Sequence, residues 1–169
     1  MNQQVNKITF SGIMIALAYV TLFFIRIPII PSASFLRLDI KEFFILIPGL
    51  LYGPFYAFTG AVIVSFLQML SVSDYGVIGL VMNILSVTAY TLPISFIYQK
   101  IHNKVGLIVG VFAGCVFVTG MMLVWNYLIS PLYMGISRKV ISTMLIPVFL
   151  PFNLIKSGVN SIMVCFYYC

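Results

Sequence analysis

The chain has 169 residues, of which 62% are hydrophobic and 7% are charged, and its mean hydropathy is +1.15. A soluble domain of this length needs far more charged surface than nine Lys and Arg with three Asp and Glu provide, so the composition predicts a membrane protein. The formal net charge of +6 does not indicate a nucleic-acid partner, because the basic residues occur singly and form no basic face or arm. Basic residues that flank membrane spans account for most of the charge.

Long apolar runs follow one another along the chain, beginning at about residue 8. The first run is longer than that of a signal peptide, so we expect it to be retained, and continuous runs do not alternate as barrel strands do. The sequence therefore predicts an all-α integral membrane protein with one membrane domain over 1–169 and a bundle of six helices. The expected spans are about 8–25, 43–53, 55–70, 77–98, 105–128 and 146–169.

An apolar loop is expected after the first span. Arg26, Pro28 and Pro31 interrupt the helix, and the following residues to about Leu38 are oilier than those of a solvated connection. Two interpretations stay open: the loop folds back over the protein as a cap, or it lies on the membrane surface.

Gly53-Pro54 interrupts the apolar stretch from Phe43 to about Leu70. One helix would be too long for a bilayer core of ~30 Å, whereas two helices of roughly 11 and 16 residues would each fall short of the ~20 needed to span it. Because Gly followed by Pro suits a tight turn, we expect two short helices here.

Pro131, Arg138 and Lys139 predict a further loop, between the last two spans. If the N-terminus is cytoplasmic, three basic residues lie inside and five lie outside, so the positive-inside rule alone argues against this orientation. The inner set is Lys7, Lys100 and Lys104, and the outer set is Arg26, Arg37, Lys41, Arg138 and Lys139.

Lys156 is the most informative polar residue, because a lysine well inside an apolar segment costs roughly 2.5–3.5 kcal/mol unless it has a partner or a wet cavity. Asn153 lies one helical turn earlier on the same face, so the pair offers hydrogen-bond donors to a ligand rich in carbonyl and ring-nitrogen acceptors. The alternative is that Lys156 reaches the membrane interface and Asn153 caps the helix after Pro151.

Asn126 stands between Trp125 and Tyr127, where its amide can bond the edge of a heterocycle while rings stack on the face. The alternative is an aromatic belt at the interface, which explains Asn126 less well. Asn83 fits a bond to a neighbouring helix better than a ligand contact.

Arg37, Asp39, Lys41 and Glu42 form the densest charge cluster of the sequence. Both acids suit a helix start and can pair locally with the two basic residues. We favour this local interpretation for Glu42, and for Asp39 a ligand contact is an equal alternative.

Small residues line one face of the first helix, and Gly12 and Ala16 have the spacing that lets two helices approach closely. We expect this face to bind a partner membrane subunit. Such pairs also occur by chance in apolar helices.

The sequence contains none of the motifs of an enzyme, and its single histidine, His102, falls in an aqueous loop. No acid lies deep in a span, which argues against a proton-coupled carrier, and the absence of a P-loop means that another chain hydrolyses any ATP. The cysteines Cys115, Cys165 and Cys169 show no metal or redox spacing, so we expect no metal site.

Several patterns along the chain together resemble a known family, the S components of energy-coupling-factor (ECF) transporters. The resemblance covers nearly the whole chain, and the last two patterns fit the riboflavin-specific branch best. The patterns are Phe35-Leu36-Arg37-Leu38-Asp39, Leu51-Tyr52-Gly53-Pro54, Gly76-Val77-Ile78-Gly79 ahead of Asn83, Asn126-Tyr127 followed by Pro131-Leu132-Tyr133, and Leu150-Pro151-Phe152-Asn153-Leu154-Ile155-Lys156.

The resemblance implies a subunit of an ECF-type ABC importer that binds riboflavin or a related flavin with high affinity, beneath the first loop and near the outer face. Its partners would be a membrane scaffold subunit and two ATPases, its N-terminus would be cytoplasmic in a bacterial plasma membrane, and it would need no cofactor. The expected ligand-binding residues are Asn126, Asn153, Lys156, Asp39, Leu36, Tyr127 and Asn83, and the expected partner-binding residues are Gly12 and Ala16.

Two departures from the family pattern affect this expectation. The chain ends at Cys169 without the basic tail expected after a sixth helix, and Gly12 with Ala16 replaces a purer alanine pair. Two alternative functions remain: an S component for thiamine, pantothenate or lipoate, since pocket residues change easily on one fold, or a membrane assembly protein whose polar residues lock helices together.

Overall fold

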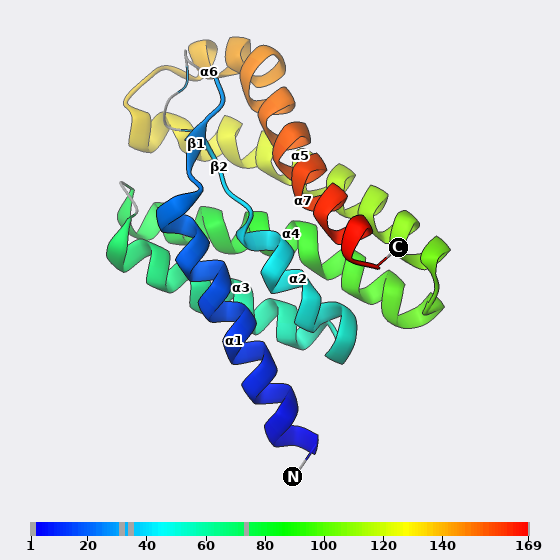
Figure 1. Cartoon of the computed structure of the whole chain (residues 1–169). Helices are drawn as coiled ribbons and strands as arrows, with labels where there is room; N and C mark the ends of the chain where they lie inside the picture. Colours follow the sequence, from blue (N-terminus) through cyan, green and yellow to red (C-terminus); the bar gives the residue numbers. More distant parts are fainter. Residues whose placement is uncertain (1–2, 31–32, 34–35, 73–74, 169) are drawn as a thin grey trace.

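The computed structural model describes residues 3–30, 33, 36–72 and 75–168, and Figure 1 shows a bundle of helices. Its elements are α1 (Gln3–Phe24), β1 (Ile27–Pro28), β2 (Arg37–Leu38), α2 (Lys41–Tyr52), α3 (Pro54–Ser71), α4 (Gly76–Ile101), α5 (Lys104–Met134), α6 (Arg138–Met144), the π-helical turn η2 (Leu145–Phe149) and α7 (Leu150–Tyr168). Within the described ranges, five segments are long and apolar enough to cross a membrane: α1, α3, α4, α5 and the continuous segment Arg138–Tyr168.

Helix α2 is the shortest of the six main helical segments and lies in the centre of the bundle, in contact with α1, α3, α4 and α7. It ends at Gly53, whose φ of +110° is a conformation that residues with a side chain rarely adopt, and Pro54 then begins α3. The predicted division of this stretch into two helices is therefore confirmed. With 12 residues, α2 is shorter than a span, and eight of them are buried.

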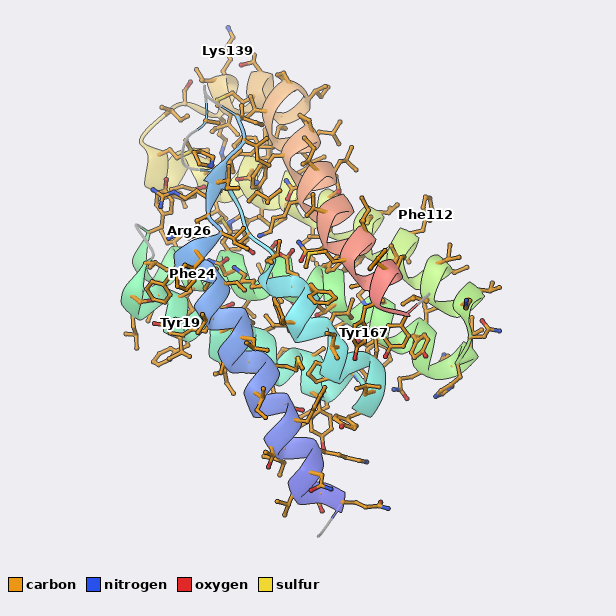
Figure 2. The ribbon with its side chains drawn as sticks, viewed as in Figure 1. Tyr19, Phe24, Arg26, Phe112, Lys139 and Tyr167 are labelled. Carbon is orange, nitrogen blue, oxygen red and sulfur yellow. The ribbon has the colours of Figure 1, made fainter. Side chains whose placement is uncertain are left out.

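Two clusters of buried side chains hold the bundle together. The first joins α2, α4, α5 and α7 and includes Leu46, Tyr90 and Val118. The second joins the four helices α1, α2, α3 and α4 and includes Leu22 and Ile45. Large apolar side chains also cover the outside of the bundle, as Figure 2 shows for Phe24 and Phe112. An apolar exterior around a packed interior is the arrangement that lipid requires.

Helices α4 and α5 pack closely because glycine removes side chains at their crossing. A Cβ atom added to Gly114 would lie 2.7 Å from the backbone oxygen of Tyr90 and 2.7 Å from Cγ1 of Ile94. A Cβ added to Gly110 would lie 3.2 Å from the backbone of Ile94. Small residues at these positions therefore set the distance between the two helices.

The predicted loop before the last span is displaced in the structure. Helix α5 continues through Pro131 to Met134, and Gly135, with φ of +68°, ends it. The expectation that Pro131 lies in a loop is wrong, because proline removes one N–H bond without ending a helix that is packed along its length. The expectation that Arg138 and Lys139 lie in this loop is also wrong, because both belong to α6.

The segment from Arg138 to Tyr168 is one continuous helical segment, longer than the predicted span 146–169. Pro147 and Pro151 lie in it, and the backbone widens into η2 there, where the N–H of Leu150 donates to the oxygen of Leu145. A π turn of this kind accommodates residues that cannot donate to the helix ladder.

The apolar loop after α1 begins and ends in two short paired strands, β1 and β2, which we call the hairpin. Its strands β1 and β2 pair antiparallel, with Ile27 opposite Leu38 and Pro28 opposite Arg37. Arg26, at the base of the hairpin, donates from Nη1 to the backbone oxygen of Val72 at 2.8 Å, which ties the loop to the end of α3. Pro31, Phe35 and Cys169, which the sequence patterns included, lie outside the described residues.

We expect Asn103→Ala to lower the free energy of unfolding by about 1 kcal/mol. Asn103 is the N-cap of α5, and its side-chain oxygen accepts the N–H of Gly106 at 2.8 Å. Ser137 is the matched control, because it precedes α6 without a side-chain cap bond. Thermal unfolding in detergent should show a lower midpoint for Asn103→Ala than for Ser137→Ala, and equal midpoints would contradict the cap.

Candidate ligand-binding cavity

A polar cavity lies between the hairpin and helices α3, α4, α5 and α7. Its central polar groups come from separate elements: Asp39 before α2, Asn126 on α5, and Asn153 with Lys156 on α7. All four residues are buried, with exposed fractions of 9% or less. The other residues that line the cavity are Arg26, Leu36, Arg37, Gln68, Tyr75, Gly79, Met82, Asn83, Ser86, Met122 and Phe152.

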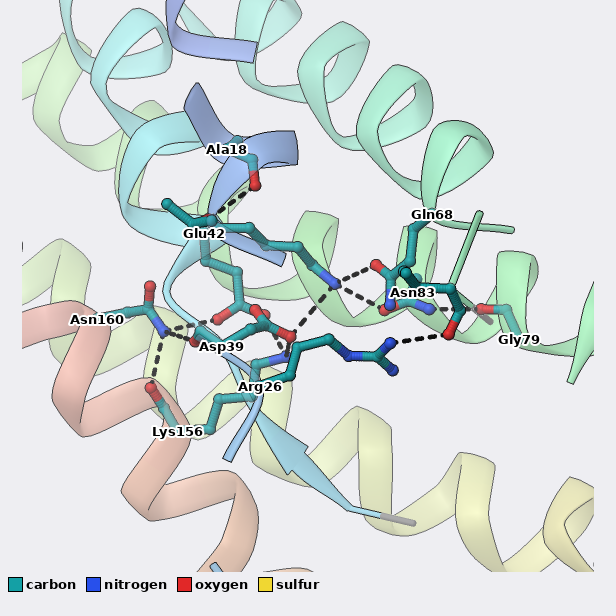
Figure 3. Close-up of polar contacts among 12 residues, drawn as sticks. Ala18, Arg26, Asp39, Glu42, Gln68, Gly79, Asn83, Lys156 and Asn160 are labelled. Carbon is teal, nitrogen blue, oxygen red and sulfur yellow. Dashed lines mark hydrogen bonds and ion pairs between the residues drawn. The ribbon is translucent and has the colours of Figure 1, made fainter. Parts of the chain in front are cut away.

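Four charged side chains meet at the inner wall of this cavity, shown in Figure 3. Lys156 Nζ lies 3.2 Å from Asp39 Oδ2 and 3.0 Å from Glu42 Oε1. Lys41 Nζ lies 3.5 Å from Asp39 Oδ2. We call these two lysines and two acids the charge quartet. Because buried charges are tolerated when they are paired, the quartet accounts for a lysine inside an apolar segment.

Lys41 is fully buried, and its ammonium group has partners on two helices and on the segment before α2. Besides Asp39, it donates to Gln68 Oε1 on α3 at 2.7 Å and to Asn83 Oδ1 on α4 at 2.9 Å. An ammonium group has three donors, of which two bond the amide oxygens, and the nearby carboxylate balances the charge. Lys41 therefore fixes the amide of Asn83, whose Nδ2 donates to Gly79 O at 2.8 Å.

Asn160 connects α7 to the start of α2. Its Nδ2 lies 3.0 Å from Glu42 Oε2 and 3.2 Å from the backbone oxygen of Asp39, and its Oδ1 accepts the N–H of Phe43 at 2.9 Å. The N-cap position of α2, Ile40, has no side-chain cap bond. Asn160 therefore supplies from another helix the acceptor that an N-cap side chain would give.

Asp39 remains ionised in this environment. Burial would raise the pKa of its carboxyl group, but the ammonium groups of Lys156 and Lys41 outweigh that effect and hold the pKa below its ordinary value. At neutral pH the carboxylate of Asp39 thus bridges the two lysines.

The two asparagines of the cavity are held by their own helices. Asn126 Nδ2 donates to Met122 O at 2.7 Å, and its Oδ1 accepts from Ser130 at 2.9 Å. Asn153 Nδ2 donates to Phe149 O at 2.7 Å, at the end of the π turn. These bonds fix both amide planes and use one N–H of each, so each amide can direct its second N–H at a ligand acceptor.

A second pocket, of about 280 Å³, lies on the outer side of α4 and α5. It is lined by apolar residues such as Leu92, Phe96 and Phe117, and the hydroxyl of Thr88 there donates to Ile84 O at 2.6 Å. None of the described residues that line this pocket is charged, so the cavity beside the charge quartet is the candidate site for a polar ligand.

A comparison with protein families agrees with this geometry. The family model described as "ECF transporter, substrate-specific component" matches residues 6–168. The chain belongs to this family of ECF transporter S components. An S component is a subunit of a transporter and not an enzyme, so the expectation that the chain has no enzymatic activity is confirmed.

This S component resembles two curated proteins along most of its length. It is 29% identical to "Riboflavin transporter FmnP" of Bacillus subtilis (strain 168), over 94% of this chain and 88% of that protein. It is 26% identical to "Riboflavin transporter RibU" of Streptococcus thermophilus (strain ATCC BAA-250 / LMG 18311), over 93% of this chain and 78% of that protein.

A solved structure, described as "Structure and mechanism of the S component of a bacterial ECF transporter", has the same fold. Its TM-score is 0.82 at 25% identity, and the match covers 98% of this chain and 95% of that chain. The predicted fold class, a six-helix membrane bundle of the S-component type, is confirmed.

The structure of this S component places most of the predicted ligand-binding residues around one cavity. Tyr127 is the exception, because its side chain is 42% exposed and it is not among the residues that line the cavity. Glu42 lies in the first turn of α2, as expected, but the expectation that it pairs with Arg37 or Lys41 is wrong, because its ion pair is with Lys156 on α7. The predicted residues at the cavity are Leu36, Asp39, Asn83, Asn126, Asn153 and Lys156.

Sequence reasoning missed Lys41, Gln68 and Asn160 as parts of the site. Asn160 follows Lys156 by four positions, so the helical period already placed the two on one face. Gln68 is a polar residue within an apolar helix, which is a signal of the same kind as Lys156. No local pattern indicated that Lys41 points inward, because a lysine at a helix start is ordinarily solvated.

Proposed function

We propose that this S component binds riboflavin in the cavity beside the charge quartet and delivers it to an ECF-type importer. The observation that carries the proposal is the convergence of Asn126, Asn153 and Lys156, which come from two helices and present amide and ammonium donors to one space. A flavin ring edge carries carbonyl and ring-nitrogen acceptors, which such donors recognise. The names of the two similar proteins support riboflavin as the ligand.

Binding of a ligand of this size needs outward movement of the cavity wall. The cavity volume is about 90 Å³, whereas pockets for small organic ligands typically hold roughly 300–1,000 Å³. Leu36 and Arg37 of the hairpin form part of the wall and connect to the rest of the bundle through a short pair of strands. We therefore propose that the hairpin is the part of the wall that moves, as a cap over the ligand.

The charges of the cavity support a cytoplasmic N-terminus. Among the basic residues assigned to the outer side, Arg26 and Arg37 line the cavity and Lys41 is buried in the charge quartet, so none of the three needs a topological explanation. Arg138 and Lys139 then remain outside, against three basic residues inside. The positive-inside rule agrees with the proposed orientation once these site residues are set aside.

The proposed importer also contains a membrane scaffold subunit and two ATPases. Gly12 and Ala16 on α1 are exposed, and a Cβ added to Gly12 would meet no described atom within 4 Å. This face is therefore open for close packing of a partner helix. We expect the double variant Gly12→Leu with Ala16→Leu to fold normally but to lose complex formation with the scaffold.

A fluorescence titration tests riboflavin binding. Purified protein in detergent should quench flavin emission saturably, and the emission of the single tryptophan, Trp125, should fall in parallel because it is adjacent to Asn126. We expect Asn126→Ala and Asn153→Ala each to weaken binding about tenfold, since each removes one hydrogen bond to the ligand.

Tyr127→Ala is the matched control for Asn126→Ala. It changes the next residue of the same helix, but the side chain lies outside the cavity, so we expect riboflavin affinity within about threefold of the unchanged protein. The absence of quenching by a folded protein would reject riboflavin, and thiamine, pantothenate and lipoate would then be titrated in turn.

A further inference from the structure

Lys156 lies between two carboxylates that occupy different positions relative to the cavity. Asp39 lines the cavity, whereas Glu42 is not among its lining residues and instead lines an adjacent small space of about 10 Å³, on the other side of Asn153 and Lys156. Glu42 therefore does not face the ligand space. It acts on Lys156 through an ion pair of 3.0 Å, and Asn160 fixes its other oxygen at 3.0 Å.

With both lysines protonated and both acids ionised, the formal charges of the quartet sum to zero. The quartet side chains have exposed fractions between 0% and 11%, so water screens them little. The elements packed around it add neutral polar groups, namely Gln68 on α3, Asn83 on α4 and Asn126 on α5. Among the described residues, the other charged side chains that line the cavity are Arg26 and Arg37 at the hairpin.

We propose that Glu42 is a positioning residue that determines ligand specificity. Its carboxylate balances the charge of Lys156 and so keeps the inner wall electrically neutral. A neutral wall accepts an uncharged ring edge and rejects an ionised one. This inference rests on the proposed binding of riboflavin and names the feature of the ligand that the site reads. A negative ring edge at the inner wall would lie beside a quartet that has no excess positive charge, which is costly at low local dielectric.

Substitutions of Glu42 and Lys41 change the charge of the quartet in opposite directions, so they should change ligand preference in opposite directions. Replacing Glu42 with a neutral residue leaves the quartet with one excess positive charge, which favours an anionic ring. Replacing Lys41 with a neutral residue leaves one excess negative charge, which disfavours the same ring. A role of these residues in folding alone would not move ligand preference in opposite directions.

The test compares three flavins at neutral pH. Riboflavin is uncharged, 8-hydroxyriboflavin is ionised and spreads its negative charge onto the pyrimidine edge, and 8-methoxyriboflavin is uncharged with a similar group at the same position. We expect the unchanged protein to bind the methoxy compound within about threefold of riboflavin, and the ionised compound at least about tenfold more weakly.

The variants are then compared by the ratio of the two dissociation constants, ionised compound over riboflavin, which cancels general losses of affinity. We expect Glu42→Gln to lower this ratio about tenfold, Lys41→Met to raise it, and Glu42→Asp, which keeps the charge, to leave it within about threefold. Glu42→Gln also keeps an oxygen for the bond from Asn160.

Each outcome decides the proposal. A ratio that is the same in Glu42→Gln, Lys41→Met and the unchanged protein would overturn it while leaving riboflavin binding intact. If Glu42→Gln does not fold, an unchanged ratio in Lys41→Met overturns it in the same way, as does tight binding of the ionised compound by the unchanged protein. Failure to bind riboflavin at all would overturn this inference together with the proposed function.

Discussion

Lys156→Met should lower the free energy of unfolding by about 3–5 kcal/mol, which is the cost of removing one partner from a buried ion pair. The substitution leaves Glu42 without its ion-pair partner and leaves Asp39 paired with Lys41 alone. Both carboxylates are almost fully buried, so water cannot replace the lost ammonium group. Chemical unfolding in detergent, followed by the emission of Trp125, measures the effect.

Lys139→Met is the matched control, because it makes the same substitution on an exposed part of the same helical segment. Lys139 extends away from the bundle in Figure 2, and its substitution should change stability by less than about 0.5 kcal/mol. Adding Glu42→Gln to Lys156→Met removes the uncompensated charge and should recover part of the loss. A loss below about 1 kcal/mol for Lys156→Met would contradict a dry, paired site.

Gly114→Ala should lower the free energy of unfolding by about 1–3 kcal/mol, the usual cost of overpacking a tight contact. The added methyl group would lie 2.7 Å from the backbone oxygen of Tyr90, and backbone cannot yield as a flexible side chain can. Helices α4 and α5 must then move apart. Because Tyr90 and the neighbouring Ile94 belong to the buried core, the separation would also loosen their packing.

Gly120→Ala tests whether the effect depends on the crossing. Gly120 lies on the same helix, and a Cβ added there meets no described atom within 4 Å. This substitution should leave stability unchanged or raise it by up to about 1 kcal/mol, because alanine favours helix more than glycine does. Thermal midpoints that fall equally for both variants would show that general helix properties, and not the α4–α5 contact, cause the loss.

The short helix α2 begins at the charged residues beside the cavity. A helix of 12 residues is too short to span, yet it places Lys41 and Glu42 at the depth of Lys156 because α2 starts inside the bundle. The break at Gly53 ends α2 after 12 residues and lets α3 pack beside it. The shortness of α2 is thus part of how the fold builds a charged site away from water.

The sequence by itself determined the class of the protein and the course of the chain. Long apolar runs require helices in lipid, because the backbone must satisfy its hydrogen bonds internally, and Gly53 with Pro54 marks a break through the restricted φ of proline and the freedom of glycine. Lys156 could be selected because a charge in an apolar segment needs a partner wherever the partner lies. These properties are local and can be read from neighbouring residues.

Only the tertiary structure decided which side chains meet. Glu42 pairs with Lys156 and not with its sequence neighbours, and Lys41 turns inward to Gln68 and Asn83. Tyr127 lies outside the cavity although it is adjacent to Asn126, because successive residues of a helix point in directions about 100° apart. Such pairings depend on how each helix is rotated and packed against the others, and no local pattern contains that information.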